Sequence, residues 1–205
     1  MLCLICFVAP LGIQTVLLPW LIVVEMQESG ARLGLAQFAL QLPAILLILA
    51  GGLLADRFDR AKILWVCHGL AALPALLLAY VIYSQALSFQ MVVVYALAMG
   101  SVTAFAQPAR DGMLNQIASD DLQKGVTIAM GLTFGGQVIG FLMGGAAESV
   151  GAVSLLIIQA IVMAFGMFFA FKLMPMSRLA GETAALSASS GAGSAILEGL
   201  RLVFT

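Results

Sequence analysis

Apolar residues fill most of the first 172 positions in six long runs, each separated from the next by a shorter polar stretch. Each run has about the 20 residues that an α-helix needs to cross the hydrocarbon core of a bilayer. The runs occupy residues 3–24, 33–55, 63–83, 89–107, 125–147 and 151–172. A lone segment in lipid must satisfy its own backbone hydrogen bonds, so each run is predicted to be a membrane-spanning helix.

The composition agrees with lipid as the solvent of these helices. Only 9% of the residues are charged and 62% are apolar, whereas a soluble domain has about a quarter charged and roughly half apolar residues. The chain therefore has too few polar side chains to cover a core in water, and we expect a multi-pass membrane protein in the bilayer. The net charge of −1 gives no indication of a nucleic-acid partner.

Basic residues indicate the orientation of the helices. If the polar stretch 56–62 lies inside, eight of the nine basic residues lie inside and only Arg32 lies outside. Because Lys and Arg are enriched in cytoplasmic loops, this bias predicts that both termini are cytoplasmic. We expect the protein in the cell (inner) membrane. The first run lacks a basic leader and a cleavage site, so we expect it to be retained as a helix.

The composition changes after Pro175. Residues 181–194 are rich in Ala, Ser and Gly, which is typical of a linker. An amphipathic pattern then resumes at 195–204. We therefore expect a six-helix bundle over residues 1–174, followed by a cytoplasmic linker over 175–205 that leads to an absent seventh helix. This pattern favours an N-terminal part of a longer protein.

The densest group of charges lies between the second and third runs. Five of the chain's charged side chains fall within seven residues, namely Asp56, Arg57, Asp59, Arg60 and Lys62. The segment Gly52-Leu-Leu-Ala-Asp-Arg-Phe-Asp-Arg60 resembles the signature loop G-x-L-A-D-R-x-G-R-[RK] of the major facilitator superfamily. Asp59 stands where that family usually has glycine, and Ala61 where it favours a basic residue.

Further motifs resemble one branch of that superfamily. They are Leu18-Pro19-Trp20-Leu21, Gln41-Leu42-Pro43-Ala44 and Gln107-Pro108-Ala109-Arg110, which are similar to motifs of the enterobactin exporters and macrolide efflux pumps. The resemblance covers the whole chain but only one half of that fold. It implies an all-α membrane protein with six transmembrane helices, the N-terminal half of a twelve-helix major facilitator fold. The missing C-terminal six-helix half would then be its partner.

The resemblance implies a conformational gate at the signature loop, formed by Gly52, Asp56, Arg57 and Arg60, with Asp56 as the clasp to the other half. Elementary chemistry is compatible with these roles. Gly52 allows two helices to approach closely, and a helix N-terminus or an arginine can hold the Asp56 carboxylate. The basic side chains can anchor the loop to anionic headgroups. The alternative is that these charges only set the topology.

The fifth run is rich in glycine. At 100° per residue its glycines form two nearly opposite sets, Gly136, Gly140 and Gly144 on one face, and Gly131, Gly135 and Gly145 on the other. A helix that is smooth on both faces is predicted to pack closely against two neighbours at once. The segment 140–145 also resembles the exporter motif G-P-x-x-G-G, with Phe141 in place of proline. The alternative is generic close packing of helices.

Polar residues inside the runs are uncharged. Asp, Glu, Lys and Arg are absent from the middle of every run, so the sequence shows no obvious proton relay. In the family, helices one, two, four and five line the central cavity, which implies substrate contacts at Gln14, Gln41, Tyr95, Thr103 and Gln137. Each of these could equally form hydrogen bonds between helices. An uncharged, amphipathic cavity suits a bulky and mostly apolar small molecule.

These observations predict a secondary-active transporter that works by alternating access. We expect it to export a hydrophobic compound such as a drug or siderophore, as an efflux antiporter. The alternatives are a lysophospholipid or nutrient transporter of a neighbouring branch, or a non-transporting or homodimeric six-helix protein. The residues contain no nucleophile–base pair, phosphate loop or metal-ligand cluster, so we expect no enzyme activity, cofactor or metal. Cys3, Cys6 and Cys67 are interpreted as free apolar thiols.

Overall fold

The computed structural model describes residues 2–117 and 122–174, which are helical apart from short turns. The elements are α1 (Leu2–Trp20), η1 (Leu21–Glu25), α2 (Gly30–Arg57), α3 (Arg60–Tyr83), α4 (Phe89–Ile117), α5 (Leu122–Gly145) and α6 (Ala147–Val150). One more helix, Ala152–Met174, follows α6 and is called the sixth spanning helix. The predicted linker at 175–205 lies outside the described residues.

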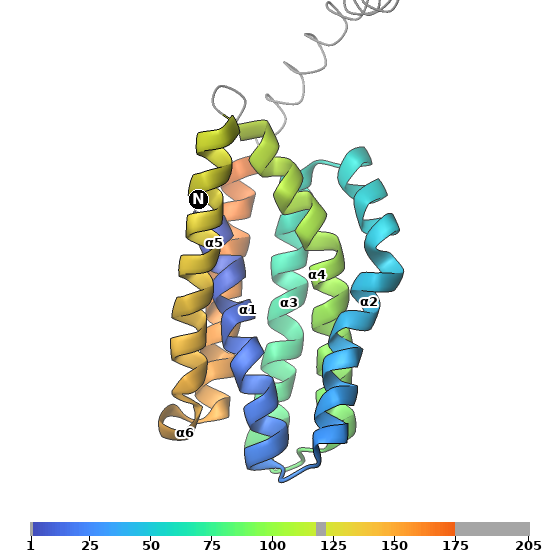
Figure 1. Cartoon of the computed structure of the whole chain (residues 1–205), viewed down its shortest axis with the longest axis vertical. Coiled ribbons are helices and arrows are strands. Elements are labelled where there is room, and N and C mark those ends of the chain that lie inside the picture. The colour runs from blue at the N-terminus through green and yellow to red at the C-terminus, as the bar shows by residue number, and fades with distance from the viewer. Residues whose placement is uncertain (1, 118–121, 175–205) are drawn as a thin grey trace, which may run out of the picture.

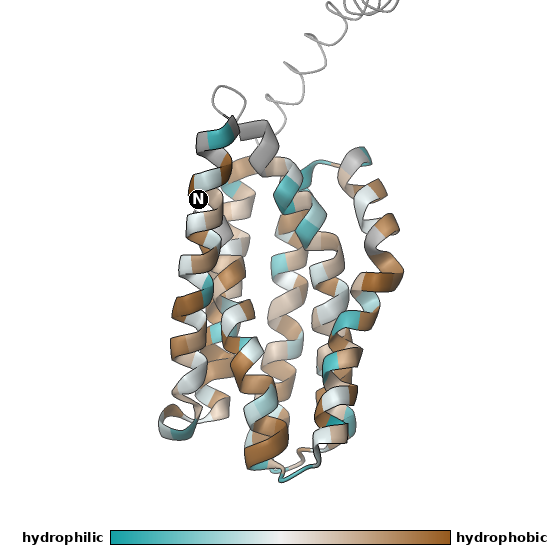
Figure 2. Cartoon of the chain, viewed as in Figure 1, coloured by the Kyte–Doolittle hydropathy of each residue, from teal (hydrophilic) through white to brown (hydrophobic). Residues whose placement is uncertain are grey.

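Six of these helices are long and apolar enough to cross a membrane, which confirms the number predicted from the sequence. Figure 2 shows apolar residues over most of their length and a hydrophilic loop between η1 and α2. One boundary differs from the prediction. Helix α4 runs on to Ile117 instead of stopping near residue 107, because Pro108 does not end it and its last turns are polar. Hydropathy detects the lipid-embedded part of such a helix and misses its polar extension.

The helices stand side by side with α5, α1 and α2 toward the viewer and α3 and the sixth spanning helix behind them (Figure 1). Apart from Arg32, the basic residues of the described chain lie at one end of the bundle, the upper end in Figure 1. This basic end holds Arg57, Arg60, Lys62, Arg110 and Lys172. Arg32 lies at the opposite end, where it pairs with Glu28 and stacks over the Phe89 ring at 5.3 Å.

Among the labelled helices, the most extensive contacts join α1 to α5 and α2 to α4. Helix α3 packs on α4, whereas α2 and α3 touch little although only two residues connect them. In each of these three pairs, α1–α5, α2–α4 and α3–α4, a helix from the first three packs on a helix from the last three. This arrangement fits two interlocked three-helix repeats.

Glycine backbones make both of these pairs close. A methyl group on Gly12 of α1 would lie 2.6 Å from the carbonyl oxygen of Gln137 in α5. One on Gly140 of α5 would overlap the carbonyl oxygen of Ala9 in α1. In the other pair, Gly51 of α2 meets the carbonyl oxygen of Ala104 in α4 in the same way. Contacts this short are reached only where a side chain is absent, which is the packing mode of small residues in membranes.

Buried polar groups join the back of the bundle to the front. His68 of α3 is fully buried, and its Nδ1 donates to the carbonyl oxygen of Leu64 at 2.7 Å. Its ring lies edge-on to Phe7 of α1, with centroids 5.3 Å apart, and against the backbone of Gly166 in the sixth spanning helix. The Cys3 thiol, also from α1, donates to the Gly166 carbonyl oxygen at 3.9 Å. His68 is therefore a packing residue where three helices meet.

Candidate functional site

The signature loop is a sharp turn between α2 and α3 at the basic end of the bundle. Helix α2 ends at Arg57, and the Phe58 amide still donates to the carbonyl oxygen of Leu54 at 2.9 Å. Asp59 then starts α3, because its Oδ1 accepts a hydrogen bond from the Ala61 amide at 3.0 Å. An aspartate at this position satisfies an amide that the helix itself leaves unpaired. The departure from the family pattern at residue 59 thus has a local structural use as a helix cap.

Arg60 ties three helices together at this turn. Its Nη1 donates to the carbonyl oxygen of Gly112 in α4 at 2.6 Å, and its Nε donates to the carbonyl oxygen of Ala55 in α2 at 3.3 Å. The Ala55 carbonyl belongs to the last turn of α2, where a cation also complements the helix dipole. Gly112 leaves the space that the guanidinium occupies, since a methyl group there would lie 2.7 Å from Cζ of Arg60. Arg60 therefore fixes the ends of α2 and α4 around the start of α3.

The other predicted gate residues differ from Arg60 in their surroundings. Arg57 is exposed. The side chain of Asp56 lies outside the described part of the structure, so its role as the clasp stays a prediction. Among the described residues, no atom lies within 4 Å of a methyl group placed on Gly52. The close helix approach expected at Gly52 falls instead at its neighbour Gly51.

The two glycine sets of α5 have different surroundings. Gly136, Gly140 and Gly144 face α1, and a methyl group on Gly144 would lie 2.8 Å from Cβ of Val16. Within the described chain, Gly131, Gly135 and Gly145 have no atom within 4 Å of an added methyl group. The second neighbour predicted for α5 is therefore not one of the described helices.

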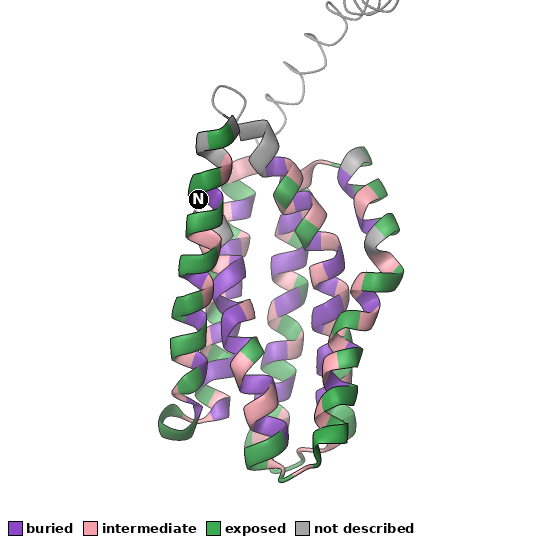
Figure 3. Ribbon diagram, viewed as in Figure 1, coloured by how far each residue is buried: buried purple, intermediate pink, exposed green. Residues whose placement is uncertain are grey.

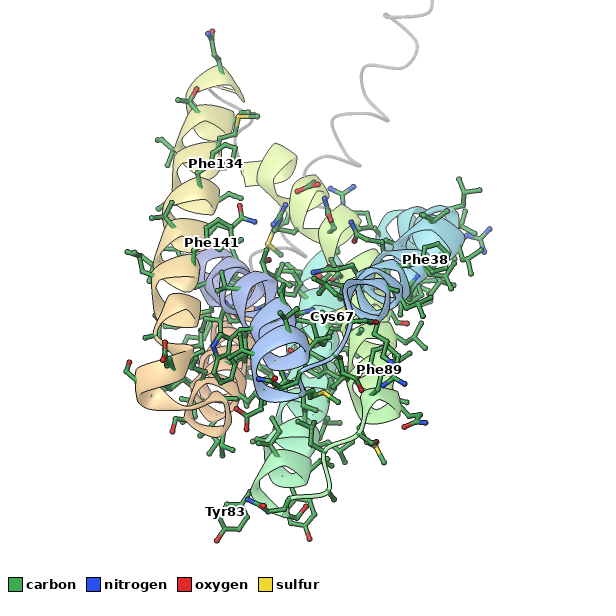
Figure 4. All side chains as sticks on the ribbon, turned by 60° about the horizontal axis from the view of Figure 1, so that its bottom comes forward. Phe38, Cys67, Tyr83, Phe89, Phe134 and Phe141 are labelled. Carbon is green, nitrogen blue, oxygen red and sulfur yellow. The ribbon has the colours of Figure 1, made fainter. Side chains whose placement is uncertain are left out.

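Helix α2 also presents an unpartnered face. Gly34, Gln41 and Ile45 of this helix are exposed. Figure 3 shows the mostly buried α1 between α5 and α2, both of which carry long exposed stretches. Figure 4 places Phe134 on α5 and Phe38 on α2, and these two rings are 65% and 57% exposed. We call this surface, formed by the exposed sides of α5 and α2 with α1 between them, the open face.

The five predicted cavity residues do not share one environment. Gln41 is exposed, Thr103 and Gln137 are half-buried, and Gln14 and Tyr95 are buried inside the bundle. The Tyr95 hydroxyl accepts a hydrogen bond from Nε2 of Gln159 in the sixth spanning helix at 3.1 Å. This contact favours the alternative role for Tyr95, a hydrogen bond between helices. Gln14, Gln41, Thr103 and Gln137 remain predicted substrate contacts.

A comparison with protein families bears on these observations. The family model described as Major Facilitator Superfamily matches residues 1–204. The chain belongs to the major facilitator superfamily. No curated protein and no solved structure matches it. The family prediction is thus confirmed, while the branch of enterobactin exporters and macrolide pumps stays a prediction.

Membership also fits the architecture of the bundle. The described residues form six spanning helices and no strand, as expected for one half of a major facilitator fold. Major facilitator proteins are membrane transporters. The open face and the signature loop are therefore the candidate functional regions of this chain. The helix cap at Asp59 and the Arg60–Gly112 bond escaped the sequence reasoning. Asp59 could have been found from the preference for Asp before a first helical turn, whereas nothing in the sequence points to Gly112.

Proposed function

We propose that this major facilitator chain forms the N-terminal half of a transporter that exports a bulky, mostly apolar small molecule by alternating access. The observation that carries the proposal is the open face, where uncharged polar groups alternate with exposed rings and glycines. A cavity wall of this kind can bind an apolar ligand through its surface and orient it through a few amides and hydroxyls. Residues 33–55 of α2 and 126–145 of α5 include no charged side chain that could neutralise a sugar phosphate or a dicarboxylate.

The same face supports a second six-helix bundle as the partner. The unpartnered glycines on α5 and the exposed Gly34 on α2 leave the backbone accessible, and small residues are what closely packed membrane helices use. Two halves that meet along such edges can rock about a site between them. Asp56, at the end of α2, would clasp the opposite half in one of the two states.

An efflux assay tests the proposal. Cells that lack their own drug exporters would carry the gene in its full reading frame and be loaded with a neutral lipophilic dye. We expect faster dye efflux than in cells with an empty vector, and slower efflux when Gln41 or Gln137 is replaced by Leu. Gln90, exposed in the first turn of α4 at the opposite end, is the control for the same replacement.

The remaining outcomes separate the alternatives. Dye accumulation in place of efflux would assign an inward transporter of the lysophospholipid or nutrient type. Absence of transport in both directions, with the protein present in the membrane, would sink the proposal. Collapsing the proton gradient shows whether the antiporter expectation holds. Unchanged transport in Asp56→Asn would remove the clasp from the mechanism.

A further inference from the structure

A groove lies between α2 and α3 near the basic end of the bundle. It has a volume of about 350 Å³ and is lined by Leu54, Phe58, Lys62, Ile63, Val66, Cys67, Leu70 and Phe105. It exists because α2 and α3 both lean on α4 and touch each other little. Phe105 of α4 also lines it. This groove does not include the residues of the predicted substrate cavity.

The chemistry of the groove is amphipathic. Seven of its eight lining side chains are apolar, and the one charge is that of Lys62, which is exposed in the first turn of α3. Lys62 and Leu70 are eight residues apart on α3, so the groove reaches about 12 Å along the helix axis. That is well into one leaflet of a hydrocarbon core about 30 Å thick. The charge therefore lies at headgroup level, and the apolar walls lie at the depth of the acyl chains.

We propose that this groove binds one anionic glycerophospholipid of the bilayer, with an acyl chain between α2 and α3 and the phosphate at Lys62. A phosphate carries the charge that Lys62 complements, and a basic residue at the membrane surface favours anionic lipids. Leu54, Val66 and Leu70 are each at least 40% exposed, so an acyl chain would cover apolar surface without displacing a packed side chain. A cationic lipophile would meet repulsion at Lys62.

The site would act on the signature loop from its lipid side. Lys62 lies two residues after Arg60, which holds α2 and α4 together. A lipid wedged between α2 and α3 would brace the same turn from outside the bundle. Lipid binding in this groove does not depend on which substrate the protein transports. It can therefore be measured in the absence of transport.

Native mass spectrometry of the full chain tests the proposal. The protein would be released from nanodiscs that contain equal amounts of phosphatidylglycerol and phosphatidylcholine, and the retained lipids would be counted. We expect preferential retention of phosphatidylglycerol and about a fivefold loss of that preference in Lys62→Gln, the effect of one basic residue at an anionic surface. Lys62→Arg should keep the preference. Lys172→Gln is the matched control, because Lys172 lies at the same basic end but outside the groove.

A second pair of variants tests the acyl-chain part. Val66→Trp fills the groove and should abolish retention of both lipids, whereas Leu77→Trp places the same ring on an exposed position of α3 outside it. Circular dichroism checks that each variant is folded. The proposal is overturned if Lys62→Gln retains phosphatidylglycerol like the unmodified chain, if Lys172→Gln loses as much, or if folded Val66→Trp still retains lipid. Equal losses in both lysine variants would indicate a diffuse attraction instead of a site.

Discussion

The two glycine faces of α5 predict opposite results for the same chemical change. Gly140→Ala places a methyl group 2.7 Å from Cα of Gly12 and in overlap with the carbonyl oxygen of Ala9. Carbon atoms pack at about 3.5–4.0 Å, so α1 and α5 must separate by about 1 Å. Both obstructing groups are backbone atoms and cannot rotate away. Gly135→Ala, less than two turns along the same helix, places its methyl group in open space.

The expected magnitudes follow from these contacts. Overpacking of this kind costs about 1–3 kcal/mol, and we expect Gly140→Ala at the upper end of that range. Alanine is favoured over glycine within a helix by up to about 1 kcal/mol, so Gly135→Ala should leave the free energy of unfolding unchanged or raise it. The two variants should therefore differ by about 2–4 kcal/mol.

Equilibrium unfolding in mixed micelles, with increasing dodecyl sulfate and helicity followed by circular dichroism, measures this difference. Gly131→Ala serves as a second control on the open side of α5. Equal midpoints for Gly140→Ala and Gly135→Ala would refute the close α1–α5 contact. If Gly135→Ala destabilised the protein and Gly140→Ala did not, the packed face of α5 would be the one that contains Gly135, which would contradict the structure.

Three other changes probe the contacts at the loop and at the back of the bundle. Arg60→Ala should lower the free energy of unfolding by about 1.5–3 kcal/mol, which is the value of hydrogen bonds from a charged group. Replacement of the exposed Arg57 by Ala should change the free energy of unfolding by no more than about 0.5 kcal/mol in the same titration. Tyr95→Phe should cost about 0.6–1.7 kcal/mol, as a lost hydrogen bond between membrane helices does, with dye efflux unchanged; loss of efflux at full stability would return Tyr95 to the substrate cavity. Gly166→Ala should destabilise by about 1–3 kcal/mol through overlap with the His68 ring. The same change in a His68→Ala background should cost less, because only the contact with Cβ of Cys6 at 3.1 Å would remain; equal costs in both backgrounds would contradict the contact with His68.

The six spans follow directly from the sequence, because lipid imposes one length and one polarity on every crossing helix. The glycine pattern of α5 also identified two smooth faces without any structure. It could not identify the neighbour, since the backbone oxygen that meets Gly140 comes from a helix more than a hundred residues earlier. For the same reason Gly51 and Gly52 could not be told apart: one meets α4 and the other meets open space.

The candidate site was less predictable than the fold. Gln14, Tyr95 and Gln41 are all uncharged polar residues within apolar runs. Only the rotation of each helix within the bundle decides which of these side chains is buried. The polar extension of α4 was missed because hydropathy identifies only the apolar segment that lies in the membrane, and a helix can continue beyond that segment. Since Gly112 lies in that extension, the bond from Arg60 to its carbonyl oxygen could not be foreseen either.

The wide sequence separation of the contacts of α1 has a consequence for how this protein is made. The Cys3 thiol meets the carbonyl oxygen of Gly166, 163 residues later. At about 5–20 residues per second of synthesis, α1 waits on the order of ten to thirty seconds for that helix, and nearly as long for α5. During this interval its glycine face and the Gln14 amide lie in lipid or against the insertion machinery, without their final neighbours. Helix α1 is thus synthesised long before the helices that supply its native contacts, so we expect insertion and assembly to be separate events in the biogenesis of this bundle.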